Sequence, residues 1–387
     1  MTIYEALAKD ADPDVRAEAR YRHGLLLADE QQYAQAAVLF RALLDEKPEV
    51  LVARLELARM LAAMGKENEA RRELRQAQAV GIPEEAAAMV DRFTRALRSD
   101  RRFGGAVELA FVPDSNINRA TEARTLDTVI APLTLSDDAR ARSGTGIRTM
   151  AQVYGRFPLS GDWSVVPRGG AQGVTYRQGQ FNDVSASALV GLERRGQRNS
   201  FTVSVGHGWR WFGNELYAET SNVGLDWIRP LGTRSQFVTS VSASDVRYSV
   251  NDLQNGGLYD LSVSLEKALN ARSGISLAGS VTRQTAQDSG YATWAGGLSS
   301  GYWRETRWGT AFVSGSMRRT KGDERLFLFP DKRREWLGAA RVGMTLRSLE
   351  MYGFAPTVRL GFERNSSTVG IYEYRRVSVD VGVARAF

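Results

Sequence analysis

The side chains best placed for joint chemistry stand in one short polar segment, Pro113-Asp114-Ser115-Asn116-Ile117-Asn118-Arg119-Ala120-Thr121. Asp114, Ser115, Asn116 and Asn118 can each hydrogen-bond nearby backbone groups, and such residues favour turns over strands. A carboxylate and amides at this spacing also suit charge-assisted hydrogen bonds to arginine. The segment therefore predicts either a loop that is merely shaped by these bonds or a loop that binds basic groups elsewhere in the fold.

Catalytic and metal chemistry find little support elsewhere in the chain. The absence of cysteine excludes thiol nucleophiles, disulfides and Cys-ligated metal sites, and two histidines exclude a multi-histidine metal centre. His207 falls on the apolar register of an alternating segment and His23 lies in a helical pattern, so we expect both to have packing or interfacial roles. No Walker-type phosphate loop is present. We expect no enzyme, no metal and no cofactor.

Composition divides the chain after Arg101. The first 101 residues contain 3 of the 37 glycines, no tryptophan, 16 basic and 18 acidic residues. The remaining 286 contain 34 glycines, all 8 tryptophans, 35 basic and 26 acidic residues. Arginines in this second part are dispersed, which argues against nucleic-acid binding. We predict an α-helical domain over 1–101 and an all-β domain over 102–387.

The helical part repeats with a period of 34 residues. A shift of 34 superposes Gly24 on Ala58 and Ala36 on Ala70, which is typical of tetratricopeptide repeats. We predict two units over 17–48 and 51–83, flanked by helices at 3–9 and 84–98; a plain helical bundle is the alternative. Resemblance to repeat proteins implies a peptide groove lined by Tyr21, Leu25, Asp29, Leu55 and Arg59.

Long apolar–polar alternation dominates the second part, as in Val107-Leu109-Phe111 and Val377-Val379-Val381-Val383. We count about 14 such segments, many of ten residues or more, whereas strands of soluble proteins average about 5–6. This is typical of membrane barrels, and tryptophans near the segment ends suit an interfacial girdle. No apolar run approaches the length of a transmembrane helix. We predict a 14-stranded antiparallel transmembrane β-barrel; a soluble sandwich or propeller is the alternative.

The connections between these segments alternate in length. Short ones fall at 160–162, 195–197, 231–233 and 271–274, and long ones at 113–142, 250–257 and 320–334. Short periplasmic turns and long outer loops predict an outer-membrane barrel whose C-terminus and preceding domain lie in the periplasm. Met1 is not followed by a signal-peptide pattern, so we expect the export signal outside this sequence.

The end of the chain and the order of the features resemble known outer-membrane proteins. Phe387 resembles the aromatic C-terminal assembly signal of barrels, with Asp380 and Gly382 at its polar and glycine positions. Small repeats, Phe103-Gly104-Gly105, an alternating strand and then the Asp114 segment resemble the surface lipoprotein assembly modulators of Gram-negative bacteria. That resemblance implies a translocon that moves a surface lipoprotein or a secreted haem- or metal-scavenging protein across the outer membrane. It also implies the barrel-assembly machinery, periplasmic chaperones and outer-membrane lipids as partners.

The residues alone leave two further functions open: a passive porin whose repeat domain binds a periplasmic partner, and a soluble scaffold. Arginines on the polar register predict a basic lumen; structural salt bridges with Glu193, Glu266 and Glu363 are the alternative. A loop of about 30 residues is uncommon without a function, and a lumen of 14 strands is wide enough to need closing. We expect a gate or lumen site built from Asp114, Ser115, Asn116, Asn118, Arg119, Arg148, Arg341 and Arg359. The arginines that predict the basic lumen are Arg148, Arg156, Arg210, Arg341, Arg347, Arg359 and Arg376.

Overall fold

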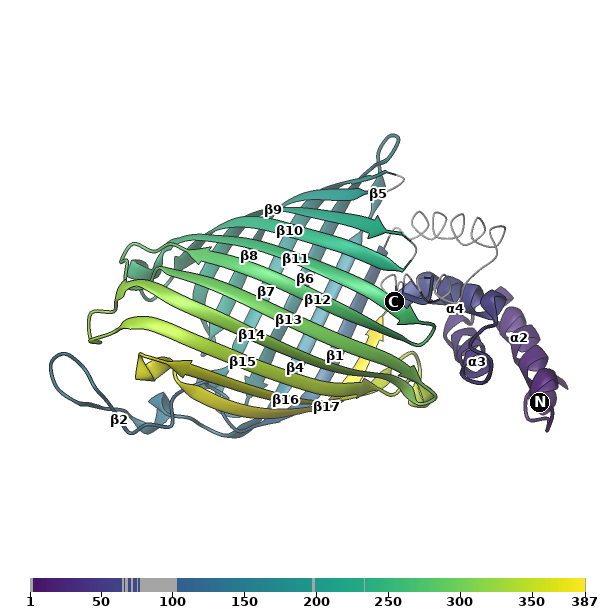
Figure 1. The fold of residues 1–387 in the computed structure, drawn as a ribbon, viewed down its shortest axis with the longest axis horizontal. Helices are drawn as coiled ribbons and strands as arrows, with labels where there is room; N and C mark the ends of the chain where they lie inside the picture. Colours follow the sequence, from purple (N-terminus) through teal and green to yellow (C-terminus); the bar gives the residue numbers. More distant parts are fainter. Residues whose placement is uncertain are drawn as a thin grey trace.

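Helices and strands occupy separate parts of the molecule. The computed structural model describes residues 3–64, 66, 69–70, 72–74, 76, 103–196, 199–232 and 234–386. Figure 1 shows a long-stranded barrel with a small group of helices beside one of its ends, the end at which the C-terminus also lies. The helix expected at 84–98 and the terminal Phe387 lie outside the described residues.

The helical segment comprises α1 (Ile3–Leu7), α2 (Pro13–Asp29), α3 (Tyr33–Glu46) and α4 (Leu51–Ala63). Asp12 caps α2 by accepting a hydrogen bond from the backbone of Asp14, and Pro13 opens the helix. Gly24 allows α2 to approach α3 closely, since a Cβ there would lie 2.8 Å from the Phe40 ring. The small residue that defines the 34-residue period is therefore a helix-packing contact, with Phe40 fully buried beneath it.

Fourteen long strands make up the barrel in the described part of the chain. Their order in the sheet follows the sequence, and β1 closes the ring by pairing with β17 on one side and β4 on the other, while β4 pairs with β6. All neighbours are antiparallel, which confirms the predicted fold class. The strands are β1 (Phe103–Asp114), β4 (Gly144–Gly155), β6 (Trp163–Tyr176), β7 (Asp183–Arg195), β8 (Ser200–Phe212), β9 (Glu215–Leu231), β10 (Ser235–Tyr248), β11 (Gly256–Asn270), β12 (Ser273–Gln284), β13 (Thr293–Thr306), β14 (Gly309–Arg325), β15 (Lys332–Thr345), β16 (Ala355–Ser367) and β17 (Tyr374–Ala386).

The alternating sequence produces a barrel that is apolar outside and polar inside. On β1, Leu109 and Phe111 are 51% and 63% exposed, whereas Glu108 and Asp114 on the opposite face are 6% and 5% exposed. Because successive side chains point to opposite faces of a sheet, the apolar set covers the outer wall, as a lipid-facing surface requires. In the soluble-sandwich alternative the apolar face of each sheet would be buried in a core. Here that face is the exposed outer wall of a closed ring, so the structure differs from that alternative.

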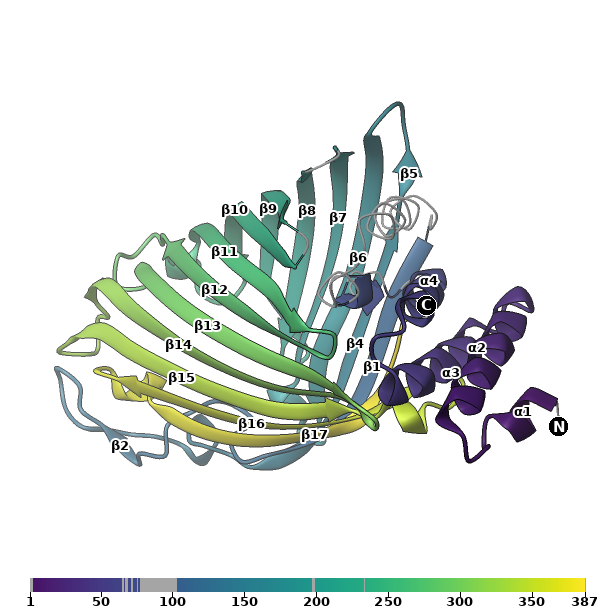
Figure 2. The same ribbon diagram turned by 45° about the vertical axis from the view of Figure 1, so that its right-hand side comes forward.

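The two ends of the barrel are differently built. Short strands β2 (Thr125–Leu126) and β3 (Leu133–Thr134) lie within the long connection after β1, at the end away from the helices (Figures 1 and 2). The prediction of a long connection over 320–334 is wrong, because β14 continues to Arg325 and β15 begins at Lys332. Polar residues there form a paired ladder all the same, because a strand beyond the apolar band needs no apolar outer face. Among the described residues, the helices are all too short or too polar to cross a membrane.

Candidate functional site at the barrel seam

The pairing between the first and last strands, which we call the seam, changes character where the polar segment begins. The register runs from Ala106↔Ala386 to Phe111↔Val381 and resumes at Asp114↔Ser378. Pro113 lies in the intervening stretch and has no N–H to donate to a ladder. From Asp114 onward, side-chain hydrogen bonds join the two strands.

Asp114 is the most enclosed acid of the segment. Its Oδ2 accepts hydrogen bonds from Nε and Nη2 of Arg376 on β17, at 2.8 and 2.6 Å. Its Oδ1 accepts the backbone N–H of Asn116 at 2.9 Å. The side chain of Asp114 is fully buried and that of Arg376 is 7% exposed. Both carboxylate oxygens are thus occupied, and Asp114 holds the start of the loop and the last strand together.

Ser115 and Asn116 extend the seam beyond β1 through hydrogen bonds to the backbone of β17. The backbone N–H of Ser115 donates to the carbonyl of Val377 at 3.0 Å, and the N–H of Val377 donates to Ser115 Oγ at 2.8 Å. Asn116 Nδ2 donates to the carbonyls of Arg375 and Ala120, at 3.0 and 2.9 Å. With its side chain 1% exposed, Asn116 supplies the bonds that a backbone ladder would otherwise make.

Asn118 instead joins the beginning of the long connection to its end. Its Nδ2 donates to the carbonyls of Asp138 and Arg140, at 3.1 and 2.7 Å, and its Oδ1 accepts the N–H of Arg142 at 3.1 Å. Arg119 adopts a left-handed backbone conformation, with φ of 47°. The connection is therefore closed at its base, a geometry that suits both the turn-shaping and the gate hypotheses.

Glu363 on β16 gathers three of the predicted arginines. It lies 3.2 Å from Arg119, 3.2 Å from Arg376 and 3.5 Å from Arg341. Through Arg376 this cluster extends to Asp114. The loop, β15, β16 and β17 therefore meet in one ionic network inside the barrel.

Three more of the predicted lumen arginines pair with acids in the same way. Arg359 binds Glu108 through both guanidinium nitrogens, at 2.5 and 2.7 Å, and Arg148 pairs with Asp380. Arg210 forms a two-pronged pair with Asp183, at 2.9 and 2.8 Å.

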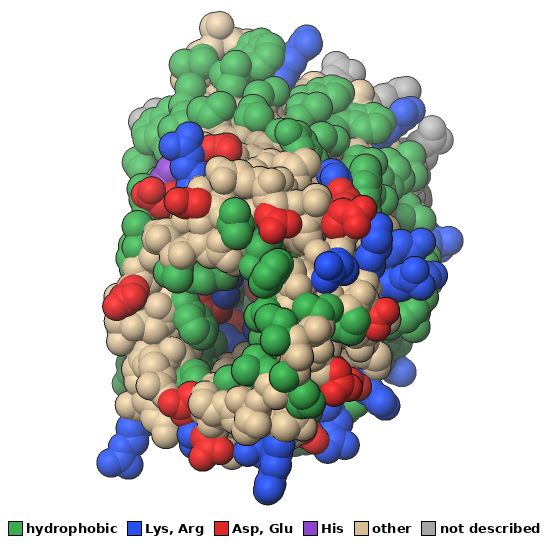
Figure 3. All heavy atoms as spheres, turned by 90° about the vertical axis from the view of Figure 1, so that its left-hand side faces the viewer, with side chains coloured by type: hydrophobic (Ala, Val, Ile, Leu, Met, Phe, Trp, Pro, Cys, Tyr) green, Lys and Arg blue, Asp and Glu red, His purple; other side chains and the backbone are tan. Residues whose placement is uncertain are grey.

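These pairs surround a cavity of about 690 Å³ inside the barrel. Figure 3, viewed onto the end away from the helices, shows a hollow with acidic and basic side chains inside it. Six arginines line the cavity, and five carboxylates line it or pair with those arginines, which leaves an excess of one positive charge. The sequence predicted a basic lumen, but the charged groups around this cavity nearly cancel. The eleven charged residues are Arg119, Arg148, Arg210, Arg341, Arg359, Arg376, Glu108, Asp114, Asp183, Glu363 and Asp380.

Two of the expected assembly-signal residues also lie at the seam. Asp380 faces the lumen, and Gly382 lies so close to β1 that a Cβ there would come within 2.1 Å of the Leu109 carbonyl oxygen. Both positions are therefore constrained by the folded barrel, whatever their role during assembly. Phe387, the third residue of the expected signal, is outside the described residues.

The five expected repeat-groove residues differ in their exposure. Leu55 is buried in a cluster with Ala58 and Leu74. Tyr21 and Leu25 pack against the helical core, with the Tyr21 and Phe40 rings 5.9 Å apart. Asp29 is exposed, and Arg59 pairs with Glu56 on its own helix at 3.1 Å. Leu55 is enclosed because α4 presents this face to the helical residues that follow it.

The structure reveals an interface that sequence reasoning missed, where the helices contact the barrel. Arg272, in the β11–β12 turn, donates to the carbonyls of Leu44 and Asp45 at 3.0 and 2.5 Å. Arg347 pairs with Glu69 at 3.2 Å and Glu305 at 3.3 Å. The expectation that Arg347 projects from a strand into the lumen is wrong, because β15 ends at Thr345 and Arg347 opens a 3₁₀ turn.

Electrostatics at this interface favour the ionised form of Glu69. Burial by itself would raise the pKa of Glu69, but Arg347, Lys66 and Arg41 outweigh it and lower that pKa from 4.5 to about 2. Glu69 and Glu305 in turn raise the pKa of Arg347, although its burial alone would lower it. No local pattern marks Arg347, since its partners come from another part of the chain.

Both the helical part and the barrel match known protein families. Residues 104–387 match the family "Surface lipoprotein assembly modifier", and residues 27–89 match a tetratricopeptide repeat. Surface lipoprotein assembly modifier 1 of Haemophilus influenzae is 21% identical over 400 aligned residues, covering 100% of this chain and 80% of that protein. Hemophilin secretion modulator of Acinetobacter baumannii is 23% identical over 60% of this chain, and the match spans about half of that protein, 51%. The outer membrane channel DcaP of A. baumannii has a TM-score of 0.44 at 8% identity, covering 74% of this chain and 96% of that one.

Proposed function

This chain belongs to the surface lipoprotein assembly modifier family, and on that basis we propose that it is an outer-membrane translocon for a protein cargo. The cargo would be a surface lipoprotein or a secreted haem- or metal-scavenging protein. The family and its named relatives support a role in lipoprotein assembly or secretion, and the barrel with its apolar outer wall accords with an outer-membrane location.

One observation carries the proposal of a regulated path: the loop after β1 is tied into the lumen network and the seam together. Asn118 closes its base, and Arg119 joins it to Glu363. A passive porin needs no such link between a loop and the first and last strands. The Asp114–Arg376 pair is the point at which loop position and seam closure are coupled.

The helical segment is proposed to receive cargo on the periplasmic side. It contacts the barrel at the end that holds the C-terminus, through Arg272 and Arg347. We propose a domain over 1–101 that docks cargo or its chaperone, and a domain over 102–387 that inserts through the barrel-assembly machinery. That machinery would recognise the C-terminal signal that includes Asp380, Gly382 and Phe387.

An export assay with two forms of the protein tests this function. The full chain and a form lacking 1–101 are expressed with a candidate cargo encoded beside the gene, and surface cargo is measured by protease shaving. We expect both forms to show heat-modifiable migration and only the full chain to export efficiently. Full export by the shortened form would contradict the docking role. Steady ion conductance without cargo, together with no export by the full chain, would identify a porin.

A further inference from the structure

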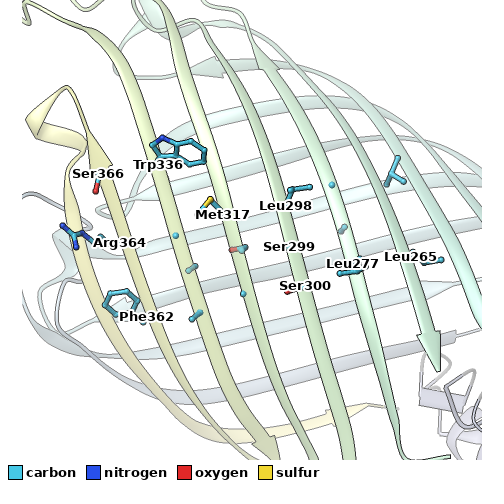
Figure 4. Close-up of a pocket in the computed structure, with 18 of the residues that line it drawn as sticks. Leu265, Leu277, Leu298, Ser299, Ser300, Met317, Trp336, Phe362, Arg364 and Ser366 are labelled. Carbon is cyan, nitrogen blue, oxygen red and sulfur yellow. The ribbon is translucent and has the colours of Figure 1, made fainter. Parts of the chain in front are cut away.

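The outer wall of the barrel carries a hollow of about 1040 Å³ across β10 to β16. Figure 4 shows Leu277, Leu298, Met317 and Trp336 following one another across neighbouring strands at this place. The pairing register places small residues side by side between larger ones, in the order Leu277, Ser300, Gly315, Ala340 and Phe362. We call this outward-facing depression the trough.

Missing side chains create the trough. A Cβ on Gly338 would meet nothing within 4 Å, and one on Gly315 would have only the Ala339 carbonyl at 4.0 Å. Leu298 and Met317, which are 73% and 58% exposed, stand beside these glycines. The depression is thus a mostly apolar space that runs across neighbouring strands of the outer wall.

Cations gather at one end of the trough. Arg364 pairs with Gly338 in the register, Arg319 with Trp336, and Lys321 with Arg334. The Arg319 guanidinium lies 5.1 Å from the centroid of the Trp336 ring. These pairings place Arg319, Lys321, Arg334 and Arg364 on the same outward face as the trough, toward the end away from the helices.

These four cations have no acidic partner within ion-pair distance in the part of the chain that the structure describes. The neighbouring acid Asp323 is already bound by Arg283 through both guanidinium nitrogens, at 2.7 and 2.6 Å. Glu324 is bound by Lys332 at 3.0 Å. Guanidinium and ammonium groups are the side-chain groups that bind phosphate in proteins, and here they lie beside an apolar space.

Another sector of the wall lacks this arrangement. On β10, Arg247 pairs with Asp245 at 3.0 Å and lies opposite Glu219 of β9 in the register. The positive charge of the β14–β16 sector is therefore not repeated at Arg247 in the β9–β10 sector.

We propose that the trough binds a phosphorylated, multiply acylated lipid of the outer leaflet, of the lipid A class. One acyl chain occupies the trough, and the lipid phosphate binds Arg319, Lys321, Arg334 and Arg364. Charge selects this occupant over the acyl anchor of a lipoprotein, which would fill the apolar space and leave the cations unused. The leaflet follows from the proposed orientation, with the end away from the helices outside the cell.

A binding measurement on the purified full chain in detergent tests the site. Native mass spectrometry is run with bis-phosphorylated lipid A, the same lipid without phosphates, and a neutral tri-acylated lipopeptide. We expect wild type to bind the phosphorylated lipid at least tenfold more tightly than the other two. The variant Arg319→Gln/Lys321→Gln/Arg334→Gln/Arg364→Gln should lose that preference, and Gly338→Leu, which fills the trough, should weaken binding with all charges kept.

Arg247→Gln is the matched control, an outward-facing arginine of another sector, and it should bind as wild type does. Heat-modifiable migration reports whether each variant is folded, and single replacements serve if the fourfold variant fails to fold. Equal binding of the phosphorylated and dephosphorylated lipids, or equal binding of the lipopeptide, would overturn the proposal. Because the readout involves no export, its failure is distinct from failure of the translocon function.

Discussion

Arg376 on the last strand donates two hydrogen bonds to a single carboxylate oxygen of Asp114 on the first strand, although the two residues are 262 positions apart in the sequence. The pair is almost completely buried, and Arg376 also reaches Glu363 at 3.2 Å. Ring closure, the start of the long loop and the lumen network therefore share one contact.

Asp114→Ala is expected to destabilise the folded barrel by about 3 kcal/mol, because it leaves Arg376 buried with only Glu363 to compensate it. The midpoint of thermal conversion on heat-modifiability gels, or of urea unfolding, measures the loss. Adding Arg376→Ala should cost less than the sum of the two single changes. Asp245→Ala is the control, since its pair with Arg247 is exposed and its loss should cost less than about 1 kcal/mol. Additive effects of Asp114→Ala and Arg376→Ala would contradict the coupling.

Asn118→Ala should loosen the base of the long connection and raise the open probability of the pore. The Asn118 side chain makes three bonds to backbone groups of 138–142, in addition to the backbone bonds between Ile117 and Arg142 and between Ala141 and Thr121. Single-channel recording beside the export assay measures the effect. Thr128→Ala is the control, because Thr128 bonds only within the exposed tip of the same loop. Wild-type current and export in a triple Ala variant of Asp114, Asn116 and Asn118, with heat-modifiability retained, would leave the segment a turn-shaping element.

Docking of the helices on the barrel should resist mild acid. The pKa of Glu69 is lowered in the folded state, from 4.5 to about 2, so its stabilising contribution is complete above about pH 4.5 and is lost as the pH falls toward about 2. Hydrogen exchange of residues 33–63 at several pH values measures docking. Glu69→Gln should loosen it at neutral pH, whereas Glu49→Gln, at an exposed position, should not. Undocking of wild type near pH 6 would show that another group controls the interface.

Gly382→Ala should block or strongly slow barrel closure, because the new Cβ would lie 2.1 Å from the Leu109 carbonyl oxygen. Gly296→Ala is the control, since a Cβ at that position meets nothing within 4 Å. Both are compared by the heat-modifiable fraction after refolding of the purified chain without assembly machinery. Deleting Phe387 should leave this refolding unchanged and slow assembly in cells. Normal refolding of Gly382→Ala would show that the seam tolerates separation there.

The sequence by itself determined the class of structure and the face of each strand. Alternation along Val377-Val379-Val381-Val383 is a local property of one segment, and it fixes which side chains meet lipid wherever that strand lies in the ring. The 34-residue period likewise identified Gly24, because helix packing needs a small residue at that spacing. The polar segment after β1 was recognised as hydrogen-bonding for the same local reason.

Only the tertiary structure decided which partners these groups bind. Ring closure brings β1 beside β17, so Asp114 meets Arg376 and not one of the arginines nearer to it in sequence. A salt bridge needs two side chains within a few ångströms, and that distance depends on strand register and ring closure, which alternation does not encode. Arg347 shows the same limit: it resembles the lumen arginines in sequence, yet the end of β15 at Thr345 and the position of the helices place it against Glu69.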